Sequence, residues 1–176
     1  SGPSVANMSL GGGRSTALDS AVQGAIQSGV SFMLAAGNSN ADACNTSPAR
    51  VPSGVTVGST TSSDSRSSFS NWGSCVDLFA PGSQIKSAWY DGGYKTISGT
   101  SMATPMVTGI GGLIASHRPD LSALELRNAV MNAVNERSSY EDKLAAQGDI
   151  SAQLALEQLG NCFQVMPGRM TIDTDH

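Results

Sequence analysis

The stretch Ser98-Gly99-Thr100-Ser101-Met102-Ala103-Thr104-Pro105 decides how the rest of this sequence is interpreted. Small residues lead here into a long apolar segment, which predicts a helix from Thr100 to about residue 116, ending before Pro119. A serine at such a helix start lies among unpaired backbone N–H groups, at the positive end of the helix dipole. This position suits a nucleophilic hydroxyl on Ser101, although Thr and Ser are also ordinary N-cap residues.

Two strands that end in glycine precede this stretch. Residues 5–10 predict a buried strand that runs into Gly11, and residues 30–36 predict a second strand that runs into Gly37. Apolar residues at helical spacing lie between them, which predicts a helix capped by Ser15 or Thr16. A strand, a helix and a strand in this order imply parallel strands and an α/β fold with a right-handed crossover. Further expected elements are strands at 55–57 and 76–79, a hairpin over 85–97, and helices over 122–134 and 151–159.

The composition excludes several classes of function. The chain has 176 residues, enough for one domain with its own core. Its net charge is −4 and it has no basic run that could follow a phosphate backbone, so we expect no nucleic-acid partner. No apolar run reaches the roughly 18 residues of a membrane span. Residues 1–4 resemble neither a signal peptide nor a natural initiator, so the sequence is expected to begin in mid-protein.

Polar residues follow the glycine-ended strands where a binding site of an α/β protein is expected. An extended peptide could pair with the glycine-rich edges at 9–12 and 35–38, because few side chains obstruct them. Asn38 could offer its amide N–H to an oxyanion, although asparagine after glycine is also a common turn residue.

In this setting the sequence resembles the C-terminal part of subtilisin-like serine proteases, in the branch of proteinase K and aqualysin. The similarity runs from about residue 5 to residue 156, in the order and spacing of that family. The resemblance implies a three-layer αβα fold with a mostly parallel sheet, from which the N-terminal part is missing. It also implies a peptidase segment over 1–160, whereas residues 161–176 show no periodicity and are predicted to form an irregular tail. The matching motifs are Ser9-Leu10-Gly11-Gly12-Gly13, Ala35-Ala36-Gly37-Asn38, Ser47-Pro48-Ala49, Phe69-Ser70-Asn71-Trp72-Gly73, Ala80-Pro81-Gly82 and Ser98 to Pro105.

The resemblance assigns a role to each matching residue. Ser101 corresponds to the nucleophile that forms the acyl-enzyme, and Asn38 corresponds to the oxyanion-hole side chain, together with the Ser101 N–H. The residues expected to bind the substrate are Ser9, Leu10 and Gly11 along its backbone, Ala35, Ala36 and Gly37 in a pocket wall, and Thr100.

The resemblance also implies two stabilising features. Asp77 corresponds to a calcium ligand, with the carbonyls of Pro52 and Gly54, although it could equally be an ordinary acid near a strand. Cys44 and Cys75 correspond to a disulfide, which implies an oxidising compartment and a secreted protein. Cys162 lies beyond the matched region and is left as a free thiol or as the partner of a residue outside this chain.

The base and the acid of a catalytic triad are not expected within these residues. The family places them upstream of the matched region. His117 is on the same predicted helix as Ser101, about 24 Å along its axis, whereas a general base must lie within about 3 Å. His176 ends an unpatterned tail. Met106 replaces a histidine that the family usually has there, which is a packing residue and not a triad member.

The sequence therefore predicts a serine endopeptidase that acts on polypeptides and needs no cofactor for catalysis, with this chain inactive alone. The expected partners are the missing N-terminal part of the same domain and a propeptide. A non-catalytic relative that binds peptides is the alternative, because half of the triad is absent and Met106 departs from the family pattern. A structural secreted domain is a third interpretation, but it leaves the glycine-ended strands unexplained.

Overall fold

The computed structural model describes residues 2–136 and 148–159. The predicted tail over 161–176, Cys162 and His176 lie outside these residues. The elements in chain order are β1 (Ser4–Met8), β2 (Gly12–Gly13), α1 (Thr16–Gln27), β3 (Val30–Ala35), η1 (Ala43–Asn45), β4 (Thr46–Ser47), β5 (Val55–Thr60), β6 (Leu78–Pro81), β7 (Ile85–Ala88), β8 (Tyr94–Ile97), α2 (Thr100–His117), α3 (Ala123–Met131), β9 (Val134–Glu136), β10 (Gly148–Ile150) and α4 (Ala152–Gln158).

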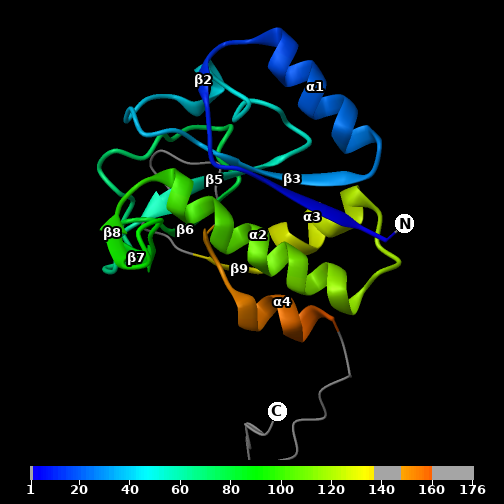
Figure 1. Cartoon of the computed structure of the whole chain (residues 1–176). Coiled ribbons are helices and arrows are strands. Elements are labelled where there is room, and N and C mark those ends of the chain that lie inside the picture. The colour runs from blue at the N-terminus through cyan, green and yellow to red at the C-terminus, as the bar shows by residue number, and fades with distance from the viewer. Residues whose placement is uncertain (1, 137–147, 160–176) are drawn as a thin grey trace, which may run out of the picture.

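A parallel sheet forms the middle layer. Its strand order is β1-β3-β5-β6-β10-β9, and only the pair β10–β9 is antiparallel. Helix α1 covers one face, whereas α2, α3 and α4 lie on the other (Figure 1). The fold is therefore a three-layer α/β arrangement with a mostly parallel sheet, as the sequence predicts. Strand β1 pairs with β3 on one side and lies at the edge of this sheet on the other.

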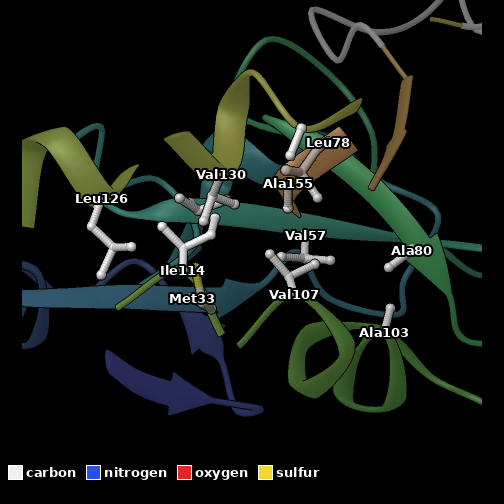
Figure 2. Close-up of a cluster of buried hydrophobic side chains, with 12 residues drawn as sticks. Met33, Val57, Leu78, Ala80, Ala103, Val107, Ile114, Leu126, Val130 and Ala155 are labelled. Atoms are coloured by element: carbon white, nitrogen blue, oxygen red, sulfur yellow. The ribbon is translucent and has the colours of Figure 1, made fainter. Parts of the chain in front are cut away.

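The main core lies between the sheet and the layer of α2, α3 and α4 (Figure 2). Met33 and Val57 from the strands pack there against Val107 and Ile114 of α2, and all four side chains are fully buried. Leu126 and Val130 complete the cluster from α3, which starts with a capping box between Ser122 and Glu125. This packing fixes α2 across the strands that lead into the predicted site.

Helix α2 is less buried than the sequence predicts. Apolar and small residues surround the helix, which is typical of a buried helix. The structure nevertheless exposes Pro105, Met106, Gly109 and Gly112 along one side, and Met106 is 43% exposed. Met106 stands where the family usually has a packing histidine, and here it lies on this exposed side of α2.

Candidate active site

Ser101 lies in the first turn of α2, next to the ends of β1 and β3. Gly99 is the N-cap residue, and its N–H donates a hydrogen bond to the carbonyl of Gly82, with N and O 2.8 Å apart. A Cβ on Gly82 would lie 2.7 Å from the Gly99 oxygen and 2.3 Å from the Ser59 hydroxyl oxygen. Only glycine allows this close approach, which fixes the loop that enters α2.

Thr100 orients the side chain of Asn38. The Thr100 backbone N–H and the Thr100 hydroxyl both donate to the Asn38 Oδ1 atom, at 2.8 and 2.9 Å. The Thr100 hydroxyl itself accepts from the N–H of Gly37 at 3.2 Å. Because two donors fix the Asn38 oxygen, its Nδ2 group must face away from Thr100. That nitrogen lies 3.5 Å from the position that a Cβ on Gly99 would take.

Ser9 and Ser101 are also joined directly. The Ser101 hydroxyl donates to the Ser9 carbonyl at 3.1 Å, and the Ser9 hydroxyl donates to the Ser101 carbonyl at 2.9 Å. Asn7 donates from its Nδ2 to the Ser9 hydroxyl oxygen at 3.0 Å, and Thr108 on the third turn of α2 donates to the Asn7 Oδ1. The structure therefore brings Ser9, Asn38 and Ser101 together from three separate segments.

These residues surround an open pocket of about 670 Å³. Ser9, Leu10 and Gly11 form part of its lining, together with Ala35, Gly37, Asn38, Thr100 and Ser101. Leu10 is 52% exposed, which leaves the edge after β1 accessible. Ala36 does not line the pocket. Its side chain is fully buried with Ala43, Ala49, Val76 and Phe79, so of the predicted wall residues 35–37 only Ala35 and Gly37 line this pocket.

Several lining residues were not assigned to the site from the sequence, and Asn71 and Asp42 are the two with the clearest structural roles. Asn71 is 2% exposed and accepts hydrogen bonds from the N–H groups of Ser39 and Ala41 on its Oδ1. Its Nδ2 donates to the Ala36 carbonyl at 2.8 Å and lies where a Cβ on Gly37 would clash, at 2.4 Å. Asn71 thus holds the loop that carries Asn38. Asn71 lies in the motif Phe69-Ser70-Asn71-Trp72-Gly73, and this position in a family motif was the signal in the sequence that could have identified it.

Asp42 is the second of these residues. It is half-buried in the pocket lining and caps η1 by accepting from the Cys44 N–H at 2.9 Å. This carboxylate places an acidic group at the pocket.

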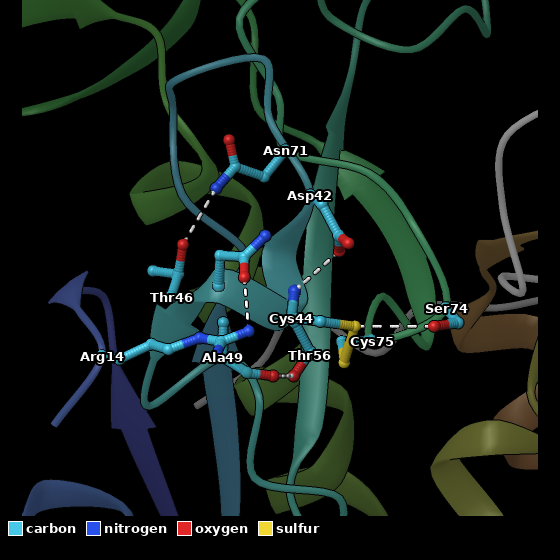
Figure 3. The surroundings of a disulfide bond; sticks show 10 residues. Arg14, Asp42, Cys44, Thr46, Ala49, Thr56, Asn71, Ser74 and Cys75 are labelled. Atoms are coloured by element: carbon cyan, nitrogen blue, oxygen red, sulfur yellow. Dashed lines mark hydrogen bonds between the residues drawn. A yellow bond between two sulfur atoms is a disulfide. The ribbon is translucent and has the colours of Figure 1, made fainter. Parts of the chain in front are cut away.

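The predicted disulfide between Cys44 and Cys75 is present, and their Cα atoms are 5.3 Å apart (Figure 3). The bond joins η1, beside the pocket, to the segment before β6. Figure 3 also shows Asp42 and Thr46 of the pocket lining on the same loop as Cys44. The disulfide therefore anchors the loop that supplies part of the pocket wall.

Two of the three predicted calcium ligands, Asp77 and Gly54, bind a cationic side chain of the protein itself. Arg127 on α3 donates from Nε to the Gly54 carbonyl at 2.9 Å and from Nη2 to the Asp77 Oδ1 at 3.1 Å. The other Asp77 oxygen accepts from the Thr56 N–H at 2.7 Å. The set therefore does not fit a calcium ion while Arg127 occupies this position. Within the described ranges, no group of three or more His, Cys, Asp or Glu side chains could hold a metal.

No described histidine can act as the base for Ser101. His117 is the histidine within residues 2–136 and 148–159, and it lies at the opposite end of α2. Its Nδ1 is 3.0 Å from the Leu113 carbonyl oxygen of the same helix. The helix rise separates His117 from Ser101 by about 24 Å. In this structure the Ser101 hydroxyl is bonded to a backbone carbonyl, not to a base.

Comparison with known proteins identifies a family match over most of the chain. The profile described as "Subtilase family" matches residues 1–153. "Alkaline serine exoprotease A" of Vibrio alginolyticus is 75% identical over 132 residues, which are 75% of this chain and 25% of that protein. "Extracellular serine proteinase" of Thermus sp. (strain Rt41A) is 52% identical over 149 residues, which are 81% of this chain and 36% of that protein. The chain thus spans about a quarter to a third of the length of these relatives.

Solved structures agree with this match. The structure described as "Crystal structure of a cold adapted subtilisin-like serine proteinase" superposes with a TM-score of 0.76 and 74% sequence identity. The match covers 86% of this chain and 54% of that one. A protease of Pseudoalteromonas arctica superposes with a TM-score of 0.79 at 29% identity, over 89% of this chain and 51% of its own. None of the helices in the described parts of the chain is long and apolar enough to cross a membrane.

Proposed function

Because the chain belongs to the subtilase family of serine proteases, we propose that it is the C-terminal part of an endopeptidase domain that carries the nucleophile and the oxyanion hole. Ser101 is the nucleophile in this proposal, and Asn38 and the Ser101 N–H are the oxyanion donors. The observation that carries it is the double hydrogen bond from Thr100 to the Asn38 Oδ1. This bond leaves the Asn38 amide N–H group free to meet a developing negative charge beside Ser101.

The proposed reaction is acyl transfer. The Ser101 Oγ attacks the carbonyl carbon of the scissile peptide bond while its proton passes to a histidine base from outside the described residues. The carbonyl oxygen becomes an oxyanion and accepts hydrogen bonds from Asn38 and the Ser101 N–H, which has no partner within the first helical turn. The C–N bond then breaks, the amine leaves with the proton, and water later releases the acyl group from Ser101.

The edge after β1 provides the proposed binding site for the substrate backbone. Ser9, Leu10 and Gly11 line the pocket, and Leu10 is exposed. An extended peptide can pair with such an edge as an added strand. The Ser9 carbonyl holds the Ser101 hydroxyl in the absence of substrate. If a substrate N–H donated a hydrogen bond to the Ser9 carbonyl, it would replace the Ser101 hydroxyl there. The hydroxyl would then be free to attack the substrate.

The histidine and aspartate of the triad are proposed to come from a segment that packs on the open side of the sheet. Strand β1 lies at the sheet edge, and neither β1 nor the exposed side of α2 carries a charged side chain between Ser4 and Met8 or between Thr100 and Ser116. This uncharged surface suits the missing N-terminal part of the same domain. A propeptide that guides assembly is a further proposed partner, and the proposed location is extracellular. Calcium has no part in this proposal, because Arg127 binds Asp77 and Gly54, two of the three predicted ligands.

A chimera tests the proposal. The part of the cold-adapted subtilisin-like proteinase that this chain does not match is joined to this chain, and hydrolysis of a chromogenic peptide is measured. We expect activity that Ser101→Ala abolishes and that Asn38→Ala lowers by about 10²–10³ in kcat, the loss found on removal of such a donor in subtilisin, a member of this family. Full activity in the Asn38→Ala chimera would contradict the assigned oxyanion role.

The isolated chain provides the second arm of the test. Without a base for Ser101, it should react poorly with a fluorophosphonate probe, whereas the chimera should be labelled at Ser101. The alternative is a non-catalytic peptide-binding relative. A folded chimera that bound the peptide substrate, but neither cleaved it nor reacted with the probe, would favour that alternative.

A further inference from the structure

The β7–β8 hairpin projects from the fold directly before the proposed active site. Strands β7 and β8 pair from Ile85 with Ile97 to Ala88 with Tyr94. Within the two strands only Ile85 and Ile97, at the base, are half-buried, and the other strand residues are exposed. Exposed hairpins of this kind are marginally stable without a further contact. The exposed strands of the hairpin are therefore available to bind a partner.

The base of the hairpin is fixed to the loop that carries the nucleophile. The Gln84 N–H donates to the Ser98 hydroxyl oxygen at 2.9 Å, and the Gly99 N–H donates to Gly82 at 2.8 Å. Strand β8 ends at Ile97, and α2 begins at Thr100 (Figure 1). A polypeptide whose scissile bond lies at Ser101 therefore passes close to the base of the hairpin.

Aromatic and basic side chains gather on this hairpin. Tyr90 is 91% exposed and Tyr94 is 74% exposed, and the rings of Trp89 and Tyr90 are 5.5 Å apart. The Lys86 ammonium lies 5.0 Å from the Tyr94 ring centre, and the Lys95 ammonium lies 4.5 Å from that of Trp89. Trp89 itself is half-buried. Tyrosine and tryptophan are among the residues that most often dominate binding at protein interfaces.

The charge of the hairpin is opposite to that of the chain. Lys86 and Lys95 are two of the three lysines in the sequence, and Asp91 in the turn is the acid of this segment. The whole chain carries a net charge of −4. An acidic partner is therefore attracted to the hairpin and repelled by the rest of the molecule, which gives orientation as well as affinity.

The hairpin faces a different part of the substrate from the pocket. Its residues do not line the 670 Å³ pocket, which lies on the side of Ser9, Ala35 and Asn38. In the proposed function that pocket holds residues that precede the scissile bond. Because that pocket takes the residues before the bond, our inference assigns the hairpin to the residues that follow it. Each strand has four residues and is about 13 Å long, which matches about four residues of extended peptide.

We propose that the β7–β8 hairpin is a docking surface for an acidic polypeptide segment that follows the scissile bond. This inference rests on the proposed function, because Ser101 defines where the substrate is cut. The lysines attract the acidic side chains, and Trp89 and Tyr94 provide apolar contact area. The hairpin thus selects for substrate sequence beyond the bond that is cleaved.

Peptide binding to the whole chain tests the inference. Two fluorescent peptides of equal length and composition carry acidic residues either after or before a central apolar residue, and fluorescence anisotropy gives the Kd of each. We expect the peptide with acids after the centre to bind more tightly. Lys86→Gln and Lys95→Gln should each raise its Kd by about 1.5–5-fold, the range for exposed ion pairs. Trp89→Ala should raise it by about tenfold.

Matched controls separate the hairpin from general electrostatics. Arg118→Gln removes an exposed cation at the other end of α2 and should leave the Kd unchanged. Raising the salt concentration to about 1 M, where the Debye length is about 3 Å, should remove the preference between the two peptides. Circular dichroism confirms that each variant is folded.

Three results would overturn the inference: equal affinity for both peptides, equal effects of Arg118→Gln and Lys95→Gln, or no peptide binding. Binding of the hairpin to anionic lipid vesicles, with loss in Trp89→Ala and no peptide preference, would assign it to a membrane surface instead. The chimera assay is independent of these outcomes. If the chimera is active while the peptides show no dependence on the hairpin, the docking inference fails and the proposed function stands.

Discussion

Ser9 and Ser101 exchange two hydrogen bonds across the start of α2, and Pro105 explains one of them. Proline has no N–H group, so the Ser101 carbonyl lacks the partner that residue 105 would otherwise provide in a helix. The Ser9 hydroxyl donates to this carbonyl at 2.9 Å. The strand end before the pocket and the first turn of α2 are thus joined by a bond that the proline makes possible.

A double-mutant cycle tests this relationship. Ser9→Ala should lower the free energy of unfolding by about 1–2 kcal/mol, because it leaves the Ser101 carbonyl without a partner. In a Pro105→Ala background the new N–H can bond to that carbonyl, so the same change should cost about 1 kcal/mol less. Urea denaturation measures both values. Ser116→Ala, which removes an exposed hydroxyl bonded to Leu113, is the control and should show no such coupling.

Thr100 is predicted to act on catalysis through Asn38. In the chimeric protease, Thr100→Val keeps the side-chain shape but removes the hydroxyl that donates to the Asn38 Oδ1. We expect kcat to fall by about tenfold with little change in KM, because the bond orients a group that acts in the transition state. Thr100→Ser keeps the donor and should restore most of the rate. A loss confined to KM would show that Thr100 serves substrate binding instead.

Asn71 should be more important for stability than its polar side chain suggests. Asn71→Ala removes the acceptor of the Ser39 and Ala41 N–H groups and the donor to the Ala36 carbonyl, all near a buried site. We expect a loss of about 3 kcal/mol in the free energy of unfolding. Ser39→Ala provides the control, because the bond uses its backbone N–H and not its side chain. Equal melting curves for both variants would contradict the assigned role.

Much of the site could be predicted because it depends on the ends of parallel strands. Such strands bring their carboxyl ends to one edge, so the glycine-ended strands and Ser101 were expected together. Ala36 differs from Ala35 and Gly37 for a simple reason. Neighbouring residues in an extended chain point in opposite directions, so a wall that contains Ala35 cannot also contain the side chain of Ala36. The alternation of side chains along a strand is therefore enough to predict that Ala35 and Ala36 face opposite ways.

Other features could not be obtained from local patterns. Arg127 binds Gly54 and Asp77, which are 73 and 50 positions away in the sequence. The periodicity of a sequence does not predict such distant partners of a long side chain. The apolar pattern around α2 is typical of a buried helix, yet one side of α2 is exposed. Such a pattern indicates that a face is buried, but it does not identify the segment that packs against that face. The resemblance to a family supplied the disulfide pairing, since spacing alone leaves the three cysteines undecided.

The disulfide is predicted to contribute strongly to stability. Cys44 and Cys75 are 31 positions apart, and closing such a loop is worth about 3–4 kcal/mol. The double variant Cys44→Ser/Cys75→Ser should lose about that amount in urea denaturation. Non-reducing peptide mapping of the parent should show the 44–75 bond, with Cys162 outside this pair. A bond from Cys162 to either residue would contradict the assignment.

Asp77 is predicted to make the stability of the chain depend on pH. Burial of the side chain raises the pKa of Asp77 above its ordinary value of 3.8, against the opposing effects of the Thr56 N–H and the Arg127 charge. An acid with a raised pKa holds its proton more tightly in the folded state. Its contribution to stability is therefore present below pH 3.8 and is lost as pH rises through the folded pKa.

The variant Asp77→Asn isolates this contribution. Its free energy of unfolding, measured in urea from below pH 3.8 to neutral pH, should fall less with rising pH than that of the parent, because asparagine does not ionise. The difference between the two proteins should become constant above the folded pKa. Asp91→Asn, which removes an exposed carboxylate from the hairpin turn, should follow the parent curve. A stability of the parent that instead rose relative to Asp77→Asn over this interval would mean that the Arg127 ion pair outweighs the burial of Asp77.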